Sequence, residues 1–156
     1  RFTSILLLQL KGRWCSCFNP EADLNAVQTL FVYDKGIIEG LGLTMDSPVI
    51  PDRAKRILKR SIYEGLAGNE RRLNLYFRPS RLTRNEIITN EILQIDVHVP
   101  ATQDYFAYRV QKRVRELLHK KQVGTMILHF DGQLGELPSM QGFVCVGSRY
   151  NFYRVI

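Results

Sequence analysis

Apolar and polar positions alternate most regularly near the middle of the chain, over residues 91–99. Successive side chains of a β-strand point to opposite faces, so this stretch predicts a strand with one buried face and one polar face. The same period of two predicts three further strands: 72–77, ended by Pro79; 125–130, ended by a turn at Asp131 and Gly132; and 142–155.

Two other segments show the spacing of a helix. Apolar residues three and four positions apart predict one helix over 52–66, with Ser47 and Asp52 near its start. A second amphipathic helix is predicted over 102–121. The basic residues at the end of this second segment suit the partial negative charge of a helix C-terminus.

The remaining segments are predicted to be less regular. Pro20 and several glycines interrupt the apolar clusters of residues 1–50, which favours short strands or turns over long helices. We interpret residues 1–50 as an N-terminal extension packed on or beside the main domain, which spans 51–156. The polar stretch 78–90, between two predicted strands, is expected to form an exposed hairpin arm.

The order of elements after residue 50 is helix, strand, arm, strand, helix, strand and strand. This order indicates an α+β fold, with a mainly antiparallel β-sheet, a projecting hairpin arm and two amphipathic helices packed on one face. The last strand carries aromatic side chains on both faces, with Phe152 on one and Tyr153 on the other. A lone subunit would leave one of these faces exposed, so we expect an identical neighbour to cover it.

Composition and charge add a candidate binding surface. The chain has 156 residues, 45% of them hydrophobic, which fits one folded core and excludes a disordered protein. Residues 1–50 carry 4 basic and 5 acidic side chains, residues 51–84 carry 10 and 3, and residues 85–156 carry 8 and 7, so the net charge of +7 lies in the middle segment. Such clustering predicts a surface that faces an acidic partner or DNA. The residues expected there are Arg53, Arg56, Lys59 and Arg60.

The cysteines and the longest apolar run exclude several classes of protein. Cys15, Cys17 and Cys145 are odd in number and lack the spacing of metal ligands, which favours reduced thiols over a zinc site. The apolar run at residues 5–8 is far shorter than the ~18 residues of a membrane span. No membrane or secretion route is therefore expected.

Two pairs of residues are the candidates for catalysis. Asp96 with His98, and His129 with Asp131, stand two positions apart, so a carboxylate could orient an imidazole in each pair. No nucleophile or metal-binding signature accompanies either pair. We therefore predict a protein that is not an enzyme and that uses no cofactor and no metal.

Segments in the second half of the chain resemble a known family. They are EILQIDVHV at 91–99, the helix that runs to 121, GFV at 142–144 and RYNFY at 149–153. Together they look like the tail-terminator, or tail-completion, proteins of long-tailed bacteriophages, and the similarity covers residues 52–156. The first fifty residues depart from the compact pattern of that family.

The resemblance implies a structural role in the virion. Members of the family form a hexameric ring at the head–tail junction, where the ring caps the tail tube and joins the tail to the head. It implies four kinds of partner: identical subunits, the tail tube protein, a head-closure or adaptor protein, and DNA passing through the lumen. The protein would be made in the host cytoplasm and then reside in the virion.

We expect the arm and the polar face of the 91–99 strand to contact neighbouring subunits. The residues expected in these contacts are Arg78, Arg81, Arg84, Glu86, Asp96, His98, Arg149 and Tyr153. Three alternatives remain open: a head-closure or adaptor protein of the same neck, a basic DNA-binding protein, and a small enzyme that uses His98 or His129.

Overall fold

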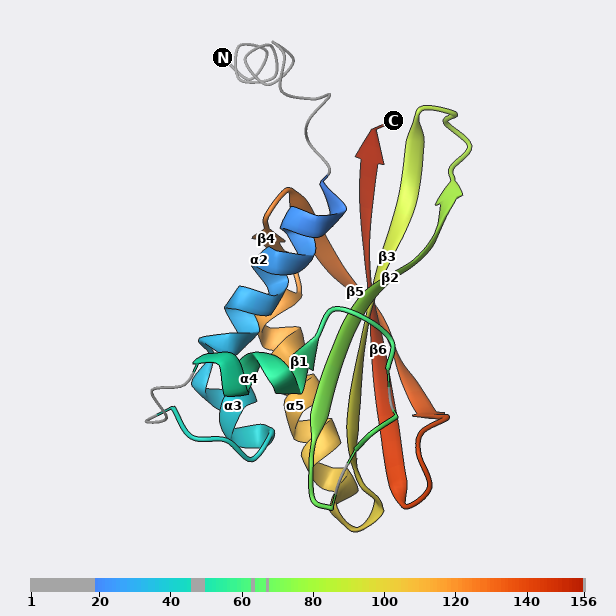
Figure 1. Cartoon of the computed structure of the whole chain (residues 1–156). Coiled ribbons are helices and arrows are strands. Elements are labelled where there is room, and N and C mark those ends of the chain that lie inside the picture. The colour runs from blue at the N-terminus through green and yellow to red at the C-terminus, as the bar shows by residue number, and fades with distance from the viewer. Residues whose placement is uncertain (1–18, 46–49, 63, 67, 156) are drawn as a thin grey trace.

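The computed structural model describes residues 19–45, 50–62, 64–66 and 68–155, and Figure 1 shows their arrangement. Cys15 and Cys17 lie outside the described residues. The fold belongs to the α+β class, as predicted. Helices gather on one side of a curved β-sheet, whose strands run the length of the molecule (Figure 1).

The sheet has six strands in the order β1-β2-β3-β6-β5-β4. Their bounds are β1 Ile57–Leu58, β2 Arg72–Leu82, β3 Ile88–Pro100, β4 Lys121–Val123, β5 Met126–Leu137 and β6 Phe143–Val155. Strand β1 pairs in parallel with β2, whereas the four other neighbouring pairs are antiparallel. The sheet is therefore mixed, and the prediction of a mainly antiparallel sheet needs this correction. Sequence reasoning missed β1 because its two residues lie inside the segment predicted as a helix.

The described helices are α2, α3, α4 and α5, with a short 3₁₀ turn before α5. Their bounds are α2 Pro20–Val32, α3 Lys35–Gly40, α4 Ile50–Arg56 and α5 Asp104–Leu118, and the 3₁₀ turn spans Ala101–Gln103. Helix α5 confirms the amphipathic helix predicted over 102–121, although the chain leaves it three residues earlier to form β4. The helix predicted over 52–66 is wrong in its extent, because α4 ends at Arg56 and the chain continues into β1.

Helices α2 and α3 replace the turns and short strands expected before residue 50. Asn19 caps α2, because its side chain accepts a hydrogen bond of 3.2 Å from Ala22 N, and Pro20 occupies the first turn, where no main-chain donor is needed. Asp34 caps α3 by accepting from Ile37 N at 3.0 Å. The glycines that suggested turns, Gly36 and Gly40, lie inside α3. Close packing explains the glycine at position 40, because a Cβ there would stand 2.6 Å from a methyl group of Val110.

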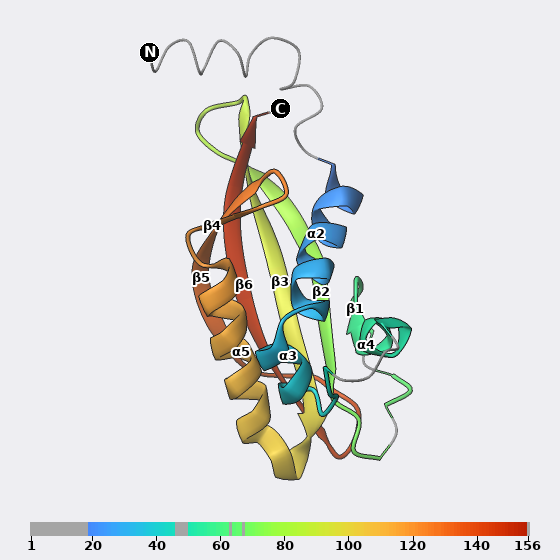
Figure 2. The ribbon, with the colours of Figure 1, turned by 90° about the vertical axis from the view of Figure 1, so that its left-hand side faces the viewer.

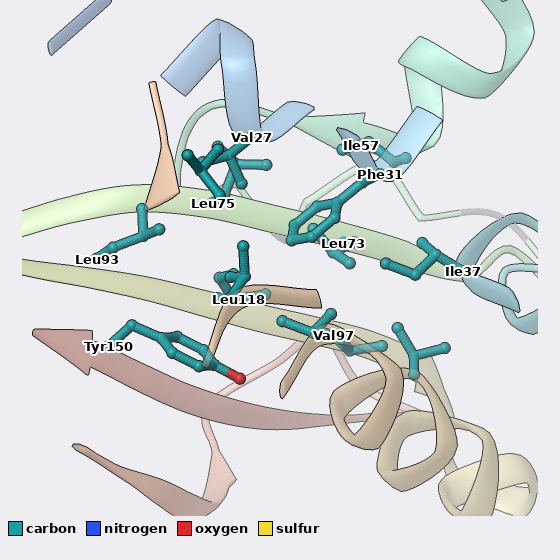
Figure 3. Close-up of a cluster of buried hydrophobic side chains, with 14 of the residues drawn as sticks. Val27, Phe31, Ile37, Ile57, Leu73, Leu75, Leu93, Val97, Leu118 and Tyr150 are labelled. Carbon is teal, nitrogen blue, oxygen red and sulfur yellow. The ribbon is translucent and has the colours of Figure 1, made fainter. Parts of the chain in front are cut away.

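The core lies between this helical layer and the sheet. Figure 3 shows Phe31 of α2 beside Leu73 of β2, with Leu118 and Tyr150 further along the same layer. These four side chains have essentially no exposed surface. Burial of large apolar side chains is the main favourable contribution to folding, so α2 is part of the core that stabilises the sheet. The predicted domain boundary at residue 50 stays a prediction, but the buried cluster extends on both sides of it.

Two carboxylates form hydrogen bonds that link the N-terminal helices to the rest of the chain. Asp34 forms a two-pronged contact with Arg113 of α5, with N–O distances of 2.7 and 3.0 Å. The hydrogen bond from Arg113 holds the pKa of Asp34 below its ordinary value. Asp23 of α2 is buried and accepts from the main-chain N of Thr125 at 2.9 Å and from its hydroxyl at 2.6 Å. Figure 2 shows α2 and α5 in front of the strands, with α3 against α5.

Strands β3 and β6 confirm the predictions over 91–99 and 142–155. Two predicted strand ends are wrong, because β2 runs through Pro79 and β5 runs through Gly132. The register shifts at both places, between Arg78 and Arg81 and between Phe130 and Gly132. Proline is tolerated on an edge strand, where its missing N–H faces no partner, and β1 pairs only with the start of β2. A bulge adds a residue to a strand without ending it. Pro79 and Gly132, which the sequence predicted to end strands, therefore mark places of irregular pairing within β2 and β5.

Candidate functional site

The far ends of β2, β3 and β6 extend beyond the helices (Figure 1). We call residues 78–90 the arm; they comprise the end of β2, the turn that follows it and the start of β3. Its turn is closed by main-chain hydrogen bonds, from Thr83 N to Ile88 O at 3.0 Å and from Ile88 N to Asn85 O at 3.0 Å. An ion pair between Glu91 of β3 and Arg154 of β6 lies at its base. These contacts close the turn between β2 and β3.

Apolar side chains are exposed at this end of the sheet. Within the described residues, eight large hydrophobic side chains are exposed, and half of them are on the arm or on the end of β6 beside it. They are Leu82, Ile87, Tyr153 and Val155. The register places Asn90 opposite Tyr153 and Ile88 opposite Val155, so these strands lie side by side. Leu82 pairs with Thr89, which pairs with Arg154. Leu82 therefore lies at the same end of the sheet but on the face opposite Tyr153 and Val155. Exposed apolar side chains at one end of a sheet suit contact with another protein.

The predicted arm residues Arg78, Arg81, Arg84 and Glu86 are all exposed. Residues 78–90 therefore present three positive charges and one negative charge. The tip combines apolar area with arginine, and arginine is enriched in protein interfaces because its guanidinium pairs well with carboxylates. The structure thus brings these four predicted residues together with Tyr153, which is 61% exposed.

Asp96 and His98 lie elsewhere and are buried, with only 5% and 2% of their surface exposed. Both point to the face of the sheet away from the helices, which the sequence predicted to be an outer polar face. That prediction is wrong, because two other segments of the chain, near Ile62 and near Ser139, cover this face. Asn74 donates to Ile62 O at 2.7 Å from one side, and Ser139 lies 2.8 Å from His98 Nδ1 on the other.

The buried polar groups on this face form a connected set. Tyr76 donates its hydroxyl to Asp96 at 2.6 Å, and Gln94 donates to the other oxygen of Asp96 at 2.9 Å. Burial and the hydrogen bond to Asp96 raise the pKa of Tyr76 to about 12. These two hydrogen bonds make the buried Asp96 carboxylate far less costly than an isolated one, so Asp96 stabilises this face rather than presenting a contact. The side-chain oxygens of Asn74 and Gln94 are buried there without a hydrogen-bond partner among the described residues.

The electrostatics of this face argue against acid–base or nucleophilic chemistry. Burial lowers the pKa of His98 to about 4, with Asp96 and Arg72 acting in opposite directions. His98 is therefore neutral at pH 7. Burial raises the pKa of Cys145, which stands opposite His98 in the sheet, so its thiol remains protonated. A thiol nucleophile needs a lowered pKa and access to substrate.

The second candidate pair, His129 and Asp131, is exposed on β5. The bulge between Phe130 and Gly132 interrupts the alternation there, so a spacing of two no longer places both side chains on one face. Within the described ranges, no group of three or more His, Cys, Asp or Glu side chains could hold a metal ion. No helix in that part of the chain is long and apolar enough to cross a membrane.

The predicted basic surface is dispersed in the structure. Arg53 is buried and donates to Met45 O at 2.6 Å, so it does not face outward. Arg56 is half-buried and lies 3.4 Å from Arg71 O. Lys59 and Arg60 are exposed, but they follow β1 and are not on a helix. The four residues thus share no helical face, because α4 is one turn shorter than the spacing required.

Sequence reasoning also missed an acidic segment on β5. Strand β4 pairs only with Met126 to Leu128, so the described chain leaves the outer side of β5 without a partner strand from His129 onward. Residues 129–137 contain Asp131 and Glu136, both exposed, and no lysine or arginine. The only sequence signal was the absence of basic residues here in a chain with a net charge of +7.

Gly147 of β6 is tightly packed against side chains of the two neighbouring strands, β3 and β5. A Cβ at Gly147 would stand 2.7 Å from Asp96 Oδ1 and 2.7 Å from a methyl group of Leu137. Gly147→Ala should lower the free energy of unfolding by about 1–3 kcal/mol, because the Asp96 carboxylate is held by the two hydrogen bonds described above and cannot move away freely. Urea unfolding measures the change. Gly135→Ala is the matched control, since nothing lies within 4 Å of a Cβ at that position; equal stability of the two variants would contradict the close packing.

A scan against protein-family models and a search of curated proteins found no match to this chain.

Proposed function

We propose that this protein is a non-enzymatic subunit of a homo-oligomeric ring at the head–tail junction of a tailed-phage virion, where it ends the tail tube and joins tail to head. The resemblance of residues 52–156 to tail-terminator proteins suggests this role. The observation that carries it is the end of the β2–β3 hairpin, which exposes Leu82, Ile87 and three arginines beyond the helices. The isolated chain gains nothing from exposing these apolar side chains, whereas a neighbour would bury them.

A ring also requires a second, different surface that receives the first. We assign this role to residues 129–137 of β5. The arm residues 78–90 have a net charge of +2, from three arginines and Glu86, and residues 129–137 have a net charge of −2, from Asp131 and Glu136. Strands β2 and β5 lie on opposite sides of the central pair β3 and β6. Opposite charges at opposite sides of one subunit suit a head-to-tail contact, which gives a ring when the rotation between subunits closes.

Charge reversal tests this contact directly. Arg81→Glu and Glu136→Arg should each shift the protein from rings to monomers in sedimentation velocity and negative-stain images, because each places like charges together. The double variant Arg81→Glu/Glu136→Arg should restore rings, since it exchanges the two charges. Lys112→Glu, on the exposed side of α5, is the control and should leave rings intact.

Two results would contradict the proposal. Wild-type protein that stays monomeric at high concentration would contradict ring formation. Rings that persist in both single variants would show that the contact between subunits lies elsewhere. A monomer that instead binds duplex DNA tightly, with an affinity that falls steeply with salt, would favour the DNA-binding alternative.

A further inference from the structure

A cavity of about 490 Å³ lies between α4 and the start of β2, in the part of the chain with the greatest excess of positive charge. Figure 2 shows α4 and β1 beside β2 at this side of the sheet. Three of its lining residues are cationic and one is acidic, so the walls have a net charge of +2. The lining residues are Leu43, Lys55, Arg56, Gly65, Glu70 and Arg72.

Main-chain carbonyls position two of these cations. Arg72 donates to Ile62 O at 3.3 Å and to Glu64 O at 2.9 Å, and Arg56 lies 3.4 Å from Arg71 O. A neutral carbonyl orients a guanidinium without cancelling its charge. In the described residues, neither Arg56 nor Arg72 forms an ion pair with a carboxylate. Arg72 Nε is also buried there without a hydrogen-bond partner.

The excess charge affects neighbouring groups. The pKa of Arg71 is lowered, first by burial and then by repulsion from Arg56. Arg72 acts in the same direction on His98. Like charges held together in a partly buried place raise the free energy of the protein, and a bound anion would reduce that repulsion.

We propose that this cavity binds a phosphate group. A free phosphate carries close to two negative charges, which match the net charge of the walls, whereas a backbone phosphodiester carries one; the oxygens of both accept the paired N–H groups that a guanidinium presents. The shared chemistry covers two sources, a free phosphate and the phosphate of a nucleic-acid backbone. The cavity is open to solvent and large enough for a phosphate with part of an attached sugar. The proposal does not depend on ring formation.

Calorimetric titration of the full chain with inorganic phosphate, in a buffer free of other multivalent anions, tests the site. Wild-type protein should bind phosphate, and Arg56→Gln should bind it about tenfold more weakly or worse, because a charged hydrogen bond is lost. Arg115→Gln, an exposed arginine on α5, is the matched control and should bind as the wild type does. If circular dichroism shows that Arg56→Gln is unfolded, Lys55→Gln at an exposed lining position replaces it.

A short oligothymidylate without terminal phosphates distinguishes the two sources. Competition with inorganic phosphate would identify the nucleic-acid backbone as a ligand, and binding of phosphate without competition would identify a free phosphate or a phosphate monoester. Absence of phosphate binding at millimolar concentration would overturn the proposal. Equal weakening by Arg56→Gln and Arg115→Gln would overturn it as well, because the attraction would then come from the overall charge.

Discussion

Phe31→Ala should lower the free energy of unfolding by about 3–5 kcal/mol, the cost expected for removing a fully buried aromatic side chain. Phe31 is 0% exposed and lies between α2 and the sheet, beside Leu73 (Figure 3). The loss combines the apolar surface no longer buried with the cavity left behind, because neighbouring side chains close such a space only in part. Most domains are stable by only about 5–15 kcal/mol, so the variant should be close to unfolding under ordinary conditions.

Urea unfolding at 25 °C measures this loss, and Tyr33→Ala is the matched control. Tyr33 follows α2 directly and is 57% exposed, so its removal should change stability by no more than about 0.5 kcal/mol. If the two variants were equally stable, the N-terminal helices would be an appendage whose contacts add little to the fold.

Lowering the pH from 6.5 to 4 should remove about 3 kcal/mol of stability through His98 alone. The folded protein holds the pKa of this histidine at about 4, against 6.5 in an unfolded chain, because the ring is buried beside Ser139. Between these two values the unfolded chain binds more protons than the folded one. Stability therefore falls as the pH falls through this window, and it is fully present above pH 6.5.

Urea unfolding at several pH values between 7 and 4 measures the slope. His98→Gln should be less stable at pH 7, yet its stability should change much less across the window. His129→Gln, at an exposed position, should keep the slope of the wild type. Asp34 does not confuse the measurement, because its pKa is lowered and its contribution is lost only below the window. A wild-type slope in His98→Gln would contradict this assignment.

The exposure of a candidate residue could be predicted from the sequence where that exposure depends on the neighbouring residues alone. The exposure of residues 78–90 was predicted from their polar side chains between two strand patterns, and Arg78, Arg81, Arg84 and Glu86 are exposed. Asp96 and His98 occupy polar positions of an alternating strand, which normally face water. They are buried because residues near Ile62 and Ser139, far away in sequence, cross over them. No pattern within residues 91–99 could have indicated that cover.

The sequence alone therefore determined the elements whose apolar residues recur with a regular period. Strands β3 and β6 and helix α5 each place an apolar side in the core, and the period of those apolar residues predicts the element even though the other face of β3 and β6 is also partly buried. Only the tertiary structure decided the rest. It placed α2 and α3 in the core, ended α4 at β1, carried β2 through Pro79 at the sheet edge and covered the second face of the sheet. Each of these outcomes depends on contacts between distant segments, whose energies are not encoded in any local period of the chain.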